Sequence, residues 1–206
     1  MCIRDRAWFP FCLLIIAGVS VASLPGCGGL GVRSKVSVGP RLTAARLGSI
    51  RCAMTYDGDW LGGIPPWDEL SADLELAARR GVDLVIDLRS SRARASQPLD
   101  DPVTAAGLRL ITVSDGPPEA EAAALASGLS AHVVDEIRSI LNAPGRRRSL
   151  LMDEHGTRAS MVYAIHLAAD EGIAEAEALR AVRATGMSQA NADFVQQQIA
   201  RIRSEF

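Results

Sequence analysis

A loop in the last third of the chain combines residue types that could bind an anion. An apolar stretch at 149–152 leads into Asp153-Glu-His-Gly-Thr-Arg158, and an amphipathic pattern begins where these residues end. Backbone N–H groups at a helix start can surround an anion, and an arginine can hold it with two parallel hydrogen bonds. The glycine permits the turn that points these N–H groups inward. The spacing therefore predicts an anion cradle at residues 153–158, clamped by Arg158.

The cradle opens with a carboxylate, and no thiol can take its place. The four cysteines are Cys2, Cys12, Cys27 and Cys52, so none lies beyond residue 52. Only Cys52 is expected as a free thiol in the mature domain. We therefore expect no disulfide and no cysteine metal site within that domain.

The loop resembles the C-x-x-G-x-R phosphate loop of the cysteine-dependent dual-specificity and tyrosine phosphatase superfamily, in its bacterial branch, with Asp153 in place of the catalytic cysteine. Two more segments resemble that branch in the same order, Leu61-Gly-Gly-Ile-Pro-Pro66 and Gly81-Val-Asp-Leu-Val-Ile-Asp-Leu-Arg89. The resemblance covers roughly residues 49 to 200. It implies an α/β domain of three layers, with a mostly parallel central sheet flanked by helices.

The resemblance also assigns roles to individual residues. Asp153 stands at the nucleophile position, and Asp115, in the Pro-rich loop after the stretch 108–113, is the candidate general acid, although Asp-Gly-Pro is also an ordinary turn sequence. The phosphate-binding residues implied by the resemblance are Glu154, His155, Gly156, Thr157 and Arg158.

A carboxylate at the nucleophile position changes what the loop can do. The donors that stabilise a thiolate would also stabilise Asp153, but its fixed charge would repel a phosphate dianion, and Glu154 adds a second charge. Two unit charges about 4 Å apart cost about 4 kcal/mol at an effective dielectric constant near 20. The histidine that precedes the nucleophile in the family is replaced by Met152. The pattern therefore favours a catalytically inactive relative, a pseudophosphatase.

Three alternatives remain open on the sequence. The first is an active phosphatase or phosphate-ester hydrolase with a non-cysteine route, through an aspartyl phosphate on Asp153 or a water activated by His155. The second is an inactive rhodanese-like module, because rhodaneses carry a similar loop. In the third, Arg158 has a structural role: it pairs with Asp153 or Glu154 and holds the loop closed instead of binding a ligand.

The N-terminal segment predicts export. Residues 7–24 are apolar but short for a membrane span, which fits a signal-peptide core. Small residues followed by Cys27 resemble a bacterial lipobox, so Cys27 would be lipidated; an ordinary signal peptide or an uncleaved anchor is the alternative. Residues 1–6 read as the translation of a transposon-end sequencing adapter and are expected to be an artefact.

The domain organisation and partners follow from these segments. We expect a signal peptide with lipobox at 1–27, a linker at 28–48 and one phosphatase-like domain at 49–206. The product would be a membrane-anchored lipoprotein facing the periplasm or the cell surface, whose partner is a protein or a phosphate-like anion. The net charge of −2 argues against nucleic acid. No cofactor and no metal are expected, because no metal-ligand spacing accompanies His132 or His166.

Hydrophobic patterning predicts alternating strands and helices, and hence a mostly parallel sheet with helices on both faces. Strands are expected at 49–55, 82–88, 108–113 and 149–152. Helices are expected at 68–80, 119–142 in two pieces, 158–171, 174–185 and 189–204. Residues 56–66 are turn-rich, 89–101 read as a loop that contains three arginines, and 146–148 as an exposed basic connector.

Overall fold

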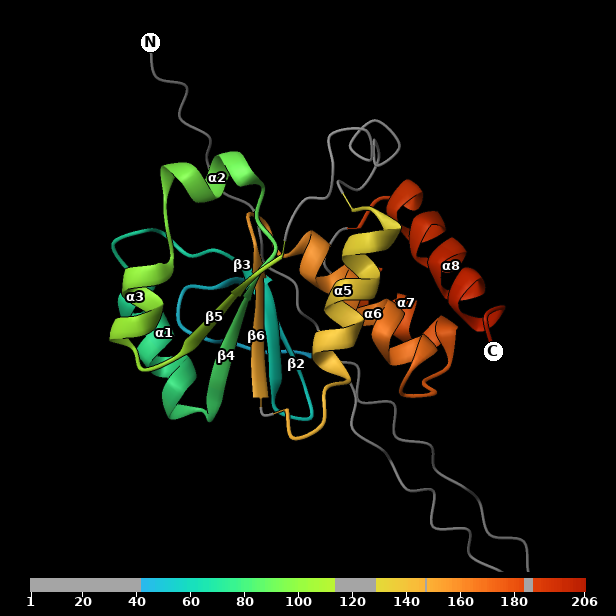
Figure 1. The fold of residues 1–206 in the computed structure, drawn as a ribbon, viewed down its shortest axis with the longest axis horizontal. Coiled ribbons are helices and arrows are strands. Elements are labelled where there is room, and N and C mark those ends of the chain that lie inside the picture. The colour runs from blue at the N-terminus through green and yellow to red at the C-terminus, as the bar shows by residue number, and fades with distance from the viewer. Residues whose placement is uncertain (1–41, 114–128, 147, 184–186) are drawn as a thin grey trace, which may run out of the picture. The chain divides into compact units, whose positions relative to one another are not determined.

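The computed structural model describes residues 42–113, 129–146, 148–183 and 187–206, which fall in one compact unit that ends at Phe206. A six-stranded sheet has the order β1-β2-β3-β6-β4-β5 (Figure 1). The pairs β3–β6, β6–β4 and β4–β5 are parallel, whereas β1–β2 and β2–β3 are antiparallel. The predicted α/β class, with a parallel centre and flanking helices, is confirmed.

The element bounds are as follows. The strands are β1 (Thr43–Ala44), β2 (Arg51–Tyr56), β3 (Asp59–Gly63), β4 (Val82–Asp87), β5 (Arg109–Thr112) and β6 (Arg148–Asp153). The helices are α1 (Leu70–Arg79), α2 (Ser91–Ser96), α3 (Asp100–Ala105), α5 (Ala131–Leu141), α6 (Thr157–Ala169), α7 (Glu175–Arg183) and α8 (Gln189–Arg203).

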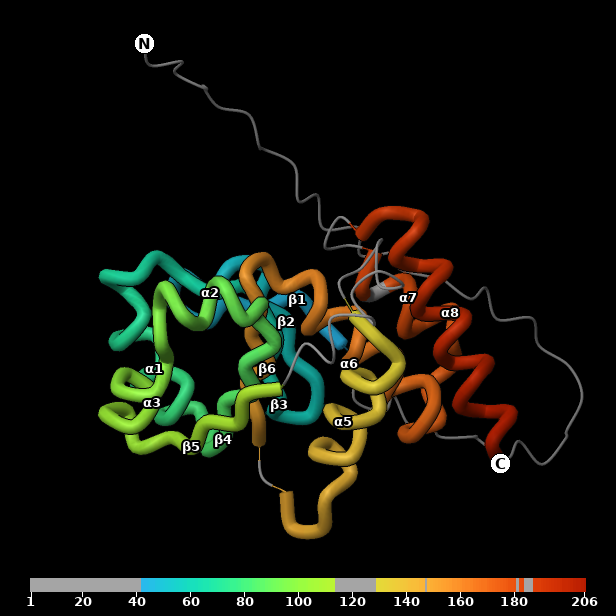
Figure 2. Tube along the Cα trace, turned by 45° about the horizontal axis from the view of Figure 1, so that its top comes forward, coloured from blue at the N-terminus to red at the C-terminus, as the bar shows by residue number. Residues whose placement is uncertain are grey.

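Two hydrophobic cores lie on opposite faces of the sheet. One core joins the sheet to α5, α6, α7 and α8, and the other joins it to α1 and α3. Figures 1 and 2 show the two groups of helices on either side of the strands. Because β4 and β6 are covered on both faces, their apolar residues run nearly without interruption, as is typical of central parallel strands.

Helix α6 is the central helix of its layer. Every residue from Ala159 to Ala168 is buried, and α6 packs against β3, β6, α5, α7 and α8. A helix that is buried all round needs this kind of enclosure. Among the described residues, no helix is both long and apolar enough to cross a membrane.

Three segments differ from the prediction. The turn-rich stretch 56–66 contains β3, in which two buried glycines stand where β-branched residues would have signalled a strand. The predicted loop 89–101 contains α2, which Ser90 caps by accepting a hydrogen bond from the N–H of Ala93. The stretch 28–48, predicted to be a linker, contains β1 and the fully buried Leu47, so folded structure begins before residue 49.

Candidate functional site

The predicted cradle begins at the carboxyl end of β6, in the middle of the sheet. β6 pairs in parallel with β3 on one side and with β4 on the other. Its last residue, Asp153, is 1% exposed, and α6 begins at Thr157. The N-terminus of α6 therefore lies at the carboxyl edge of the parallel strands (Figure 1).

The carboxylate of Asp153 occupies the ring of N–H donors. Its Oδ1 accepts hydrogen bonds from the backbone N–H groups of His155, at 2.7 Å, and of Gly156. Its Oδ2 accepts from the backbone N–H groups of Arg158 and, at 3.1 Å, of Ala159. This is the arrangement that a helix start offers to an anion, and here a side chain of the loop itself supplies the anion.

The loop is packed against β3 through two glycines. Gly156, the N-cap of α6, has a φ of +86°, in the left-handed region. A Cβ on Gly156 would lie 2.8 Å from the backbone N of Gly63, and a Cβ on Gly63 would lie 2.6 Å from the carbonyl carbon of His155. The end of β3 thus forms one wall of the loop, and this wall admits no side chain at either position.

Glu154 turns away from the cradle and binds Ser90. Its Oε1 accepts hydrogen bonds from the Ser90 backbone N–H at 2.9 Å and from the Ser90 Oγ at 2.7 Å. Burial alone would raise the pKa of Glu154, but the Ser90 hydrogen bonds and the nearby charge of Arg158 lower it below its ordinary value. The second acid of the loop therefore ties the cradle to the start of α2.

Arg158 is half-buried and reaches towards the end of β4. Its Nη1 donates a hydrogen bond to the carbonyl oxygen of Leu88 at 3.3 Å. Arg158 meets Asp153 through its backbone N–H, and no ion pair between its guanidinium and Asp153 is present among the described residues. The guanidinium thus lies beside Glu154 and Leu88, at the rim of the cradle.

Two arginines that the sequence analysis did not assign to the site support its walls. Arg51, on β2, donates from Nη2 to the carbonyl oxygens of Ile64 at 2.8 Å and Glu154 at 3.1 Å. Arg89 is 1% exposed and holds Asp87 through two hydrogen bonds of 2.9 and 2.8 Å. The strand motif that ends in Arg89 was the available signal for this pair, whereas nothing in the sequence pattern marks Arg51.

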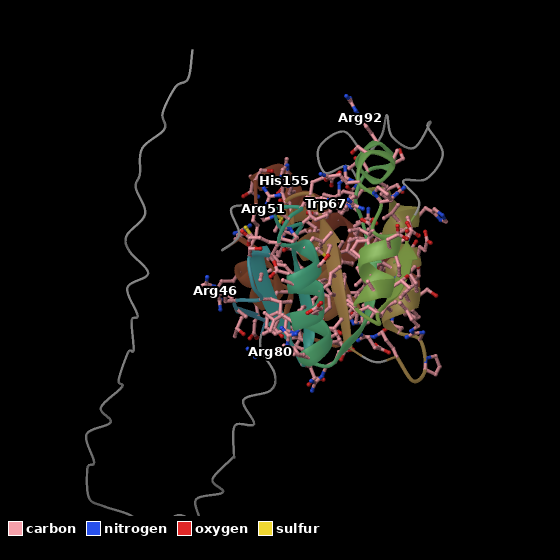
Figure 3. The ribbon with its side chains drawn as sticks, turned by 90° about the vertical axis from the view of Figure 1, so that its left-hand side faces the viewer. Arg46, Arg51, Trp67, Arg80, Arg92 and His155 are labelled. Carbon is pink, nitrogen blue, oxygen red and sulfur yellow. The ribbon has the colours of Figure 1, made fainter. Side chains whose placement is uncertain are left out.

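The other predicted site residues are dispersed. His155 is exposed, and Figure 3 shows it with Arg51 and Trp67 at the same end of the domain. His166 is instead buried in α6, with its Nδ1 3.0 Å from Asp170. The candidate general acid, Asp115, and the lipidation site, Cys27, lie outside the described residues. Over the ranges that the structure covers, no three His, Cys, Asp or Glu side chains are grouped to hold a metal ion.

Comparison with solved structures relates this site to a known fold. A DUF442 protein from Shewanella putrefaciens CN-32, described as a candidate phosphatase, matches with a TM-score of 0.57 and 16% identity, over 77% of this chain and 92% of that chain. A candidate phosphatase from Neisseria meningitidis Z2491 matches with a TM-score of 0.50 and 19% identity, over 75% and 97% of the two chains.

A third match has a ligand in its printed description. It is TpbA of P. aeruginosa, a cysteine-to-serine variant in complex with pTyr, with a TM-score of 0.51 and 16% identity over 83% of this chain and 98% of that chain. The chain has the fold of the cysteine-dependent phosphatases. No protein-family model and no curated protein matches the sequence. In this phosphatase-like domain, Asp153 is the residue at the head of the loop that faces the helix start.

Proposed function

We propose that this protein is a pseudophosphatase, a non-catalytic phosphatase-like module that binds a protein partner. The observation that carries the proposal is the Asp153 carboxylate, which accepts the loop N–H groups of His155, Gly156, Arg158 and Ala159. A phosphate group would need these same donors. Kinase associated phosphatase, which matches with a TM-score of 0.52 and 15% identity, is described with a catalytic-site cysteine.

Electrostatics opposes phosphate binding at this loop. A dianion that approached within about 4 Å of the Asp153 carboxylate would meet a repulsion of about 4 kcal/mol per charge pair at an effective dielectric constant near 20. Arg158 would offset part of this cost, but its positive charge also lies beside Glu154. The balance favours a protein partner over a phosphate-like anion as the ligand.

The alternative of an active hydrolase through Asp153 requires a free carboxylate oxygen. Attack on phosphorus would use a lone pair of Oδ1 or Oδ2, and each of these atoms accepts two backbone hydrogen bonds. Hydrogen bonds to an oxyanion lower its nucleophilic reactivity because they stabilise the charge that must be donated. The geometry therefore supports the non-catalytic proposal better than the aspartyl phosphate route.

The surface around the loop offers features that suit a protein partner. Trp67 is 43% exposed, one of two exposed large hydrophobic residues among those described. Arg51 and His155 lie at the same end (Figure 3). Tryptophan and arginine are enriched at the centres of protein interfaces. We place this partner at the cell envelope, because the apolar stretch 7–24 and Cys27 resemble a lipoprotein signal.

The test is turnover of an aryl phosphate by the full chain in detergent, compared with Asp153→Cys and with the double variant Asp153→Cys/Arg158→Ala. The proposal expects no turnover by the natural protein and measurable turnover by Asp153→Cys, abolished in the double variant. Turnover by the natural protein that is lost in Arg158→Ala would overturn the proposal and identify a non-cysteine phosphatase. Activity that persists in Arg158→Ala would indicate a contaminating enzyme.

A further inference from the structure

A polar cavity lies at the opposite end of the central strands from the cradle. It has a volume of about 210 Å³ and is lined by residues near the start of β3, the start of β6 and the middle of α6. The cradle stands at Asp153, the last residue of β6, and the cavity reaches Arg148, the first, so about 17 Å of strand separates the two sites at roughly 3.3 Å per residue. The cavity is therefore independent of the proposed pseudophosphatase site.

A tight hairpin turn and one helix face build this cavity. Asp57 and Gly58, with φ of +47° and +89°, form the two-residue connection between β2 and β3, and such Asp-Gly turns suit antiparallel strands. Tyr56 and Asp59 are cross-strand partners beside the turn, so their side chains share a face of the sheet. Helix α6 covers that face with Tyr163.

Aromatic rings form the floor of the cavity. Tyr163 packs edge-on against Tyr56, with ring centroids 6.1 Å apart, and against His166, with ring centroids 5.7 Å apart. Tyr163 and His166 are three residues apart on α6 and so share one side of the helix. Tyr163 and His166 are each 1% exposed, so their rings belong to the core behind the cavity and offer almost no surface to a ligand.

In the deep wall of the cavity, the Asp59 carboxylate already has hydrogen-bond partners within the protein. Asp59 accepts hydrogen bonds from Arg146 Nη1, at 2.8 Å to each carboxylate oxygen, and from the hydroxyl of Tyr163 at 2.9 Å. It also accepts from Ser149 N–H at 2.7 Å. The predicted exposed basic connector at 146–148 is thus wrong for Arg146, whose charge is neutralised by a buried aspartate.

The mouth of the cavity, in contrast, contains an unsatisfied hydroxyl beside acids. Tyr56 is 8% exposed, and within the described part of the chain its hydroxyl makes no hydrogen bond. Burial raises the pKa of Tyr56, and the negative charges of Glu171, Asp57 and Glu177 raise it further. Because Tyr56 lines the cavity, its hydroxyl is available to accept a hydrogen bond from a ligand or a water molecule.

From this geometry we propose that the cavity binds a primary ammonium group. The ammonium would donate hydrogen bonds to Tyr56 Oη and to the carboxylates of Asp57 and Glu171, all three of which line the cavity. Three donors of an ammonium match one hydroxyl and two carboxylate acceptors. A small alkylamine and the side chain of a lysine share this chemistry.

Arg146 and Arg148 also line the cavity, but they do not reverse its preference for a cation. Arg146 is paired with Asp59, as described above. Arg148 Nη1 donates to the carbonyl oxygen of Arg80 at 3.2 Å, and its side chain packs over Gly58. With Arg146 and Asp59 cancelling, the carboxylates of Asp57 and Glu171 outnumber the guanidinium of Arg148 at the mouth, where His166 Nε2 also lies 3.6 Å from Glu171 Oε1.

The experiment is a ligand-observed NMR titration of the full chain in detergent with n-butylammonium, with n-butanol as the neutral analogue. Nα-acetyl-lysine methylamide is titrated in parallel to distinguish a lysine side chain from a small amine. We expect saturable binding of an ammonium ligand, about tenfold weaker in Tyr56→Phe and in Glu171→Gln, because each loses a hydrogen bond to a charged group. Glu75→Gln, an exposed acid on α1, is the matched control and should bind normally.

The outcomes decide the proposal. Absence of saturable binding by both ammonium ligands, or equal binding of n-butanol, would overturn it. Undiminished binding in both cavity variants would also overturn it. If Tyr56→Phe lowers the melting temperature so far that the domain unfolds, Glu171→Gln decides alone, because Glu171 is about half exposed and its removal leaves the core intact.

Discussion

Gly156 and Gly63 touch through their backbones, so that a Cβ on Gly156 would stand 2.8 Å from the nitrogen of Gly63. This contact fixes the distance between β3 and the loop that carries Asp153. The short strand β3 is rich in glycine, and the absence of side chains lets the loop that carries Asp153 lie directly against it.

The first prediction concerns Gly156→Ala. The substitution adds a left-handed backbone penalty of about 1–2 kcal/mol and a clash with β3 of about 1–3 kcal/mol. We expect the free energy of unfolding in urea to fall by about 2–5 kcal/mol.

Gly107→Ala is the matched control, because Gly107 has a φ of +74° but nothing within 4 Å of its Cβ position. It carries the backbone penalty without the clash. Equal losses in the two variants would show that the close approach to β3 contributes nothing.

The second prediction contrasts two ion pairs anchored on β4. Arg89 and Asp87 are 1% and 2% exposed at their side chains, whereas Arg109, which pairs with Asp83, is 69% exposed. Removing one partner of a buried pair leaves an uncompensated charge, so Arg89→Met should lower the free energy of unfolding by about 3–5 kcal/mol. Arg109→Met should change it by less than about 1 kcal/mol. Similar losses, measured by urea denaturation, would contradict this account.

The third prediction concerns the pH dependence that Glu154 confers. Its pKa is lowered in the folded state, so the unfolded chain binds its proton more readily as pH falls. The stability that Glu154 contributes is therefore fully present above its ordinary pKa and is lost as pH falls through the lowered folded value. We expect Glu154→Gln to cost about 1 kcal/mol at pH 7, for a partly exposed charged hydrogen bond, and the difference to vanish in acid.

Ser90→Ala provides the control for this effect. If the Ser90 hydrogen bonds cause the lowered pKa, then the loss from Glu154→Gln should be smaller in the Ser90→Ala background, as a double-mutant cycle measures. A full loss in that background would assign the stabilisation to another neighbour of Glu154.

The sequence predicted the parallel centre of the sheet and the helices that follow the loop, because β4, β6 and α6 have long apolar patterns that local reasoning reads well. It did not predict β3. That strand is held by its neighbours and by the close approach of Gly63 to the loop, which no local propensity expresses. Tertiary context decides such a segment.

The candidate site was also predictable only in part. The spacing of Asp153, Gly156 and Arg158 implied a cradle, since a loop that ends at a helix start has few backbone solutions. The attachment of Glu154 to Ser90 joins positions 64 residues apart, and no pattern in the sequence signals it. The sequence placed a carboxylate, Asp153, at the head of this loop, and the structure shows that it accepts hydrogen bonds from the loop N–H groups.

The fourth prediction is that emptying the cradle will expose an anion site. In Asp153→Ala the N–H groups of His155, Gly156, Arg158 and Ala159 lose their acceptor, so we expect the free energy of unfolding to fall by about 2–4 kcal/mol. Added phosphate should restore part of that loss by binding the freed donors, which a phosphate-dependent rise in melting temperature would measure. The natural protein should show no such rise, and Asp153→Ala/Arg158→Ala should show a smaller one. If phosphate stabilises the natural protein as strongly as Asp153→Ala, the carboxylate does not block the cradle.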